Sequence, residues 1–107
     1  MNIVETTLNG VTVISLEGII NAASAPKLKA HIETSDHGIP MVINLEQVDF
    51  IDSSGLGVLV GLARKKKANN AVLKLANMNN RVKRVFEITQ AFSLFDIYDE
   101  VGAAAGN

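Results

Sequence analysis

Two adjacent serines occupy a position where a hydroxyl group could be chemically modified. The string Asp52-Ser53-Ser54-Gly55 follows an apolar segment and precedes a run of apolar residues at helical spacing. Asp and Ser are preferred at helix N-caps, where a side-chain oxygen accepts a hydrogen bond from an unpaired backbone N–H. A cap uses only one side chain, so a serine hydroxyl remains free beside backbone amides and a helix dipole that both favour a phosphate.

A phosphate at this corner would change the local charge strongly. It would add about −1.5 to −2 charges at neutral pH. Three carboxylates, Asp52, Asp49 and Glu46, are close to the serines in the sequence. We therefore interpret the corner as a candidate switch.

The rest of the chain lacks the usual patterns of catalytic sites. No Gly-x-Ser-x-Gly motif surrounds either serine, and the two histidines, His31 and His37, have no matching ligand cluster. The run Gly55-Leu56-Gly57 lacks the further glycine of a dinucleotide motif and the lysine of a P-loop. We interpret Asp49 and Asp52 as a turn residue and a cap or dipole partner, rather than as paired catalytic acids. These features predict a protein that is not an enzyme and needs neither a metal nor a cofactor.

Composition narrows the choice of partners. The 107 residues suit a single domain over residues 1–107. The net charge of −1 provides no overall field for nucleic acid or anionic membranes, and the basic run at residues 64–67 is interpreted as a solvated helix end. The chain has no cysteine, and no apolar run approaches the roughly 20 residues of a membrane span. We expect a cytoplasmic protein that neither binds nucleic acid nor inserts into a membrane.

The elements that position the corner follow from periodicity and turn residues. Asn9-Gly10 is a strong hairpin signal between two β-prone segments. Strands are predicted at residues 3–8, 11–16, 41–45, 72–76 and within 92–98. Helices are predicted from Ser24 and Pro26 to about residue 36, from the serine corner to about residue 67, from Asn79 or Asn80 to about residue 89, and as a weak turn after residue 99. This order predicts an α/β domain with a mixed, mostly parallel sheet of four to five strands and about four helices.

Two further expectations concern small residues. Gly57 and Gly61 lie one helical turn apart, and glycine costs about 1 kcal/mol in a helix interior, so we expect them to allow a close approach of the helix to the sheet. The small residues of the tail, 103–107, are expected to fray.

The sequence around the corner resembles the anti-sigma factor antagonist family, whose fold is the STAS domain. The resemblance covers nearly the whole chain, and the Asp-Ser-Ser-Gly-Leu-Gly string is its specific part. It rests on Gly18, on Ile43-Asn44-Leu45, on Val48-Asp49-Phe50-Ile51-Asp52-Ser53-Ser54-Gly55-Leu56-Gly57 and on Val82-Lys83-Arg84-Val85-Phe86.

This resemblance implies a domain that binds an anti-sigma factor with serine kinase activity and so releases a sigma factor. It implies that Ser53, directly after the aspartate, is phosphorylated by that partner, that the phosphate abolishes binding, and that a phosphatase restores it. With Ser53 as the modified residue, Ser54 is the better candidate for the helix cap. The implied partner-binding residues are Asn21, Asp52, Ser53, Ser54, Gly55 and Leu56.

The run before the first predicted helix departs from the family pattern. Family members often carry Gly-acidic-aliphatic-Asp there, whereas this chain has Gly18-Ile19-Ile20-Asn21 and so lacks both acidic residues. Two alternatives therefore stay open: a domain that senses a nucleotide or lipid-related small molecule, and a scaffold subunit of a signalling or transport assembly that is not phosphorylated.

Overall fold

Five strands form one mixed sheet whose spatial order is the same as their order in the chain. The structure, a computed structural model, describes residues 1–35, 40–68 and 73–106. The strands are β1 (Asn2–Leu8), β2 (Val11–Ile20), β3 (Met41–Ile51), β4 (Leu73–Ala76) and β5 (Asp96–Tyr98). β1 is antiparallel to β2 through the hairpin at Asn9 and Gly10, and every later pair is parallel. Both hairpin residues have positive φ, as an Asn-Gly turn requires.

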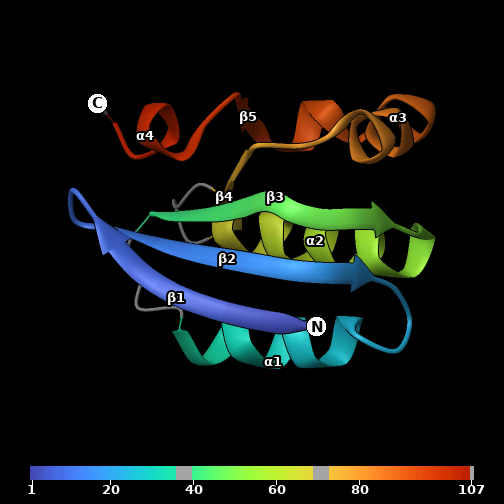
Figure 1. Cartoon of the computed structure of the whole chain (residues 1–107), viewed down its shortest axis with the longest axis horizontal. Coiled ribbons are helices and arrows are strands. Elements are labelled where there is room, and N and C mark those ends of the chain that lie inside the picture. The colour runs from blue at the N-terminus through green and yellow to red at the C-terminus, as the bar shows by residue number, and fades with distance from the viewer. Residues whose placement is uncertain (36–39, 69–72, 107) are drawn as a thin grey trace.

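Helices cover both faces of this sheet. The helices α1 (Ala25–Ser35) and α2 (Ser53–Ala68) lie together on one side of it (Figure 1). The remaining helical elements are α3 (Asn80–Thr89), the short 3₁₀ helix η1 (Ala91–Leu94) and α4 (Val101–Ala104). The predicted α/β domain with a mixed, mostly parallel sheet is confirmed.

Strand alternation divides the buried residues into two clusters. The larger cluster lies on the face covered by α1 and α2, where Ile20 and Ile51 pack with Leu28, Ile32 and Leu59. The smaller cluster lies on the opposite face and consists of Val11, Val13, Val42, Ala76, Ala104 and Ala105. α4 therefore covers only the end of the second face where β2 and β3 begin.

Parallel pairing makes two strands longer than periodicity predicts. β2 continues four residues past Leu16 to Ile20, and β3 runs without a break through Ile51. The pairing of β2 with β3 contains register shifts between Ser15 and Glu17 and between Gly18 and Ile19. At each shift β3 has one extra residue, which disturbs the alternation of buried and exposed side chains along the strand. The sequence pattern therefore predicts two short apolar segments in place of one long strand.

The end of the chain differs from expectation in its last strand. The strand expected within residues 92–98 is divided into η1 and β5, because Phe92 and Phe95 turn inward onto Phe86 with ring centroids 5.8 Å and 5.5 Å away. Ala104 and Ala105, which belong to the tail expected to fray, are buried; Asn107 lies outside the described residues.

One predicted surface feature is also corrected. Within the basic run at the end of α2, Lys66 is only 3% exposed, so the run is not wholly solvated. His31 is half-buried, and its Nε2 lies 3.3 Å from Glu5 Oε1 on β1; His37 lies outside the described residues. No helix in the described part of the chain is long and apolar enough to span a membrane.

Candidate functional site

The first turn of α2 is capped by Asp52. Its Oδ1 accepts a hydrogen bond from the Gly55 N–H at 2.9 Å, and its backbone carbonyl accepts one from the Leu56 N–H, also at 2.9 Å. The Asp52 N–H in turn donates to the Ile20 carbonyl at 3.0 Å, which joins the start of α2 to the end of β2. The preference for Ser54 as the cap is therefore wrong, because a carboxylate one residue before the helix already occupies that role.

Both serine hydroxyls are left outside the cap. Ser53 and Ser54 are exposed, and neither side chain makes a hydrogen bond within residues 1–35, 40–68 and 73–106. The cap therefore does not distinguish the two serines. Ser53 is the first residue of α2, so a group attached to its oxygen would lie beside the positive end of the helix dipole.

Gly55 fixes how closely the corner approaches the sheet. A Cβ atom at this position would lie 2.5 Å from both Cγ2 and the carbonyl oxygen of Ile20. Carbon atoms in contact are normally about 3.5–4.0 Å apart, so only glycine fits this place. The end of β2 and the first turn of α2 consequently form one tightly packed unit.

Gly57 and Gly61 do not have the role predicted for them. A Cβ atom at either position would meet nothing within 4 Å, and both glycines are exposed. They line a groove between α1 and α2, together with Ser54, Lys29, Glu33 and Lys65. The close approach of helix to sheet belongs to Gly55 instead.

The loop after β2 is held by the side chains of Asn21 and Ser24. Asn21 Oδ1 accepts hydrogen bonds from the backbone N–H groups of Ala23 and Ser24, each at 3.0 Å. Ser24 Oγ accepts one from the Asn21 N–H at 2.9 Å and donates one to the Ile19 carbonyl at 2.7 Å. Asn21 thus organises the entrance to α1, and its side-chain oxygen is already used within the loop.

Acidic and apolar side chains lie on the strands that lead to the serine corner. Glu46 and Asp49 on β3 are exposed, and Asp52 is half-buried. Ile19 and Phe50 are 47% and 42% exposed, and they are paired residues on the neighbouring strands β2 and β3. Sequence reasoning missed this pair. Strand alternation could have revealed it. Ile20 and Ile51 both point into the core, so the residues directly before them point to the opposite face of the sheet.

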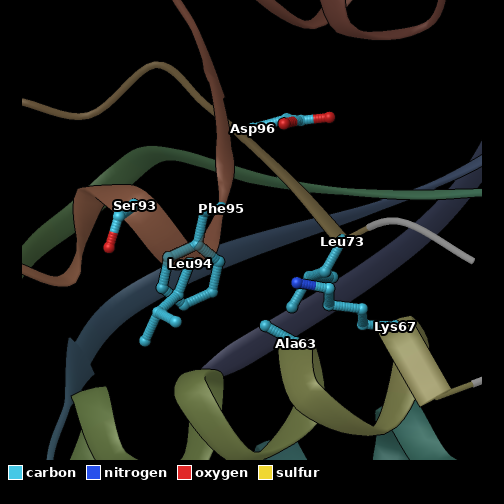
Figure 2. A pocket seen from close by; sticks show the side chains of 7 residues that line it. All are labelled: Ala63, Lys67, Leu73, Ser93, Leu94, Phe95 and Asp96. Carbon is cyan, nitrogen blue, oxygen red and sulfur yellow. The ribbon is translucent and has the colours of Figure 1, made fainter.

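One hollow of the surface, near the end of α2, gives little support to a site for a small molecule. Figure 2 shows this hollow, which measures about 220 Å³ and is lined by Ala63, Lys67, Leu73, Ser93, Leu94, Phe95 and Asp96. Pockets for small molecules usually measure about 300–1,000 Å³ and are mostly apolar. This hollow is smaller, carries charged groups of both signs, and lies at the other end of α2 from Ser53.

Comparisons with known proteins give a consistent result for fold and family. The STAS domain model matches residues 2–104. The anti-sigma-B factor antagonist of Listeria monocytogenes is 35% identical over 96 residues, which cover 88% of this chain and 84% of that protein.

Two solved structures share the fold. An anti-sigma factor antagonist from Mycobacterium paratuberculosis superposes with a TM-score of 0.87 at 24% identity, covering 96% of this chain and 89% of the other. The phosphorylated form of the Bacillus cell fate determinant SpoIIAA gives a TM-score of 0.71 at 24% identity, with 95% and 96% of the two chains covered.

Proposed function

Because this chain belongs to the STAS domain family, we propose that it is an anti-sigma factor antagonist controlled by phosphorylation of Ser53. It binds an anti-sigma factor that is also a serine kinase, and a phosphatase removes the phosphate. The chain itself acts by binding and performs no catalysis. The observation that carries the proposal is the exposed Ser53 hydroxyl, which the Asp52 cap leaves free at the start of α2.

The position of Ser53 suits a reversible modification. A kinase must bring the γ-phosphate of ATP in line with the attacking hydroxyl, so that hydroxyl has to be accessible. Ser53 is exposed and makes no hydrogen bond within the described residues, so no contact of the folded domain has to break first. A phosphate on its oxygen would be favoured by the dipole of α2, and we expect the helix to remain folded.

Charge explains how the phosphate would release the partner. A kinase that holds a nucleotide at Ser53 presents phosphate groups to this corner, and phosphoserine would meet them as like charge. The carboxylate of Asp52, next in the chain, adds to that repulsion. Each 1.4 kcal/mol lost weakens binding tenfold, so a loss of about 3 kcal/mol would lower affinity by more than a hundredfold.

The serines can be distinguished by mass spectrometry and binding together. The wild type, Ser53→Ala and Ser54→Ala are incubated with ATP, magnesium and the purified anti-sigma kinase of the source cell, and fragments are analysed for added phosphate. We expect phosphate on the wild type and on Ser54→Ala but not on Ser53→Ala. Phosphate on Ser54, or none on the wild type, would refute the assignment of Ser53.

The switch is tested separately by affinity. Calorimetric titration of the same kinase should give similar dissociation constants for the wild type and Ser53→Ala, and at least tenfold weaker binding for Ser53→Asp. Ser54→Asp is the matched control, because it adds the same charge one residue further along α2. Equal binding by Ser53→Ala and Ser53→Asp would show that charge at this residue does not control the interface.

A further inference from the structure

Ile19 and Phe50 form an exposed apolar pair beside the serine corner. They are paired residues on β2 and β3, at the end of the sheet where α2 begins. Their exposed fractions are 47% and 42%. Single exposed apolar side chains are common, but adjacent ones at the same end of two strands form a patch that is costly to leave in water.

On β2 and β3 the rest of this sheet face is either covered or polar, whereas on β1 Val4, which pairs with Ser15, is 57% exposed. α4 covers Val11, Val13 and Val42 at the opposite end of the strands. Next to them, Asn44 bonds to Ser15 and Asn77 through side-chain contacts of 3.3 Å and 3.0 Å. The face therefore changes from buried apolar to polar, and then to the exposed pair at the end nearest Ser53.

Acidic groups flank the pair. Asp49 directly precedes Phe50, is exposed, and lines a surface hollow together with Ile19 and Asn21. Glu17 lies two residues before Ile19, is exposed, and accepts a hydrogen bond from Asn2 at 2.8 Å. A complementary surface would place an apolar side chain against the pair and a lysine or arginine opposite these carboxylates.

We infer that Ile19 and Phe50 anchor the anti-sigma partner next to Ser53, by enclosing an apolar side chain of that protein that is flanked by basic residues. This inference rests on the proposed function. The run before α1 lacks the acidic residues of the family pattern, but under this inference it still binds the partner. The Ile19 side chain contacts the partner and is buried by it. The side-chain oxygen of Asn21 instead accepts hydrogen bonds within the loop.

The loop and the helix start are fixed relative to each other, which suits a shared interface. The Asp52 N–H bonds to the Ile20 carbonyl, and Gly55 packs against the same residue. Ile19, directly before Ile20, is therefore held in a constant position relative to Ser53. A partner that reaches the Ser53 hydroxyl meets Ile19 and Phe50 on the adjoining surface.

The experiment measures dissociation constants by calorimetry for the purified kinase that modifies Ser53. The variants are Ile19→Asp and Phe50→Ala. Leu8 provides matched controls as Leu8→Asp and Leu8→Ala, because it is 38% exposed and lies at the hairpin, at the other end of β2 (Figure 1). Thermal unfolding of every variant is recorded, to show that each remains folded.

We expect Ile19→Asp and Phe50→Ala each to bind at least tenfold more weakly, and both Leu8 variants to bind within twofold of the wild type. Asp49→Asn should slow association at low salt, because it removes one of the flanking charges. Binding within twofold by either Ile19→Asp or Phe50→Ala, while the wild type binds, would overturn the anchor and leave the proposed function intact. Failure of the wild type to bind the kinase would refute both.

Discussion

Substitution of the three glycines of α2 by alanine should change stability in opposite directions. Alanine is about 1 kcal/mol better than glycine in a helix interior. At Gly57 and Gly61 an added Cβ meets nothing within 4 Å, so Gly57→Ala and Gly61→Ala should each stabilise the protein by about 0.5–1 kcal/mol.

At Gly55 the free-energy cost of steric overlap should exceed the gain in helix propensity. The added Cβ would lie 2.5 Å from the Ile20 carbonyl oxygen, which is backbone and cannot rotate away. Either α2 or the end of β2 must move by about 1 Å to restore normal contact. Overpacking of this kind costs about 1–3 kcal/mol, and propensity recovers less than its full value in a first turn. We therefore expect Gly55→Ala to destabilise by about 1–2 kcal/mol.

Urea unfolding followed by circular dichroism measures these differences. Midpoints should rise for Gly57→Ala and Gly61→Ala and fall for Gly55→Ala, with a common slope that shows a change in stability alone. The three changes are chemically identical and lie within one helix, so only their surroundings differ. A stabilising Gly55→Ala would refute the close packing of the corner on Ile20. A destabilising Gly57→Ala would refute the open groove.

Three further changes test other contacts. Asp52→Ala should cost about 0.5–2 kcal/mol and Ser54→Ala close to nothing by urea unfolding, because only Asp52 bonds to the helix start; the reverse order would move the cap to the serine. Asn79→Ala should cost about 1–3 kcal/mol in the same assay, since its side chain caps α3 and also donates to the Val48 carbonyl at 2.8 Å, and a neutral result would contradict both bonds. Ala104→Asp should lower the melting temperature by about 4 °C or more, because it buries a charge in α4. An unchanged melting temperature would indicate that the tail frays, as the sequence predicts.

The sequence predicted those parts of the fold that depend on local signals. The Asn-Gly hairpin, a cap at Asn79 or Asn80 and the alternation of strands with helices are each encoded within a few residues, and together they imply the mixed sheet; the structure places the cap at Asn79. The length of β3 and the inward turn at Phe92 and Phe95 depend on contacts with distant residues. No local pattern contains that information.

The same distinction applies to the candidate site. The motif identified the serine corner, but three neighbouring polar residues, Asp52, Ser53 and Ser54, are all acceptable caps by residue type. Asp52 is the cap because α2 begins at Ser53. The hydrogen bond from the Asp52 N–H to the Ile20 carbonyl sets this start of the helix. The three glycines were equally ambiguous, since spacing along α2 did not reveal which one faces the sheet.

The tight contact between Gly55 and Ile20 also constrains how any switch at this corner can work. The first turn of α2 is held to β2 by a backbone hydrogen bond and by packing that leaves no room for a Cβ. Displacing that turn would break both contacts and uncover Ile20 and Ile51, which are fully buried. A phosphate on Ser53 needs no such displacement, because the side chain already faces solvent. The folded domain therefore favours a signal carried by charge on a fixed surface over one carried by movement of the helix.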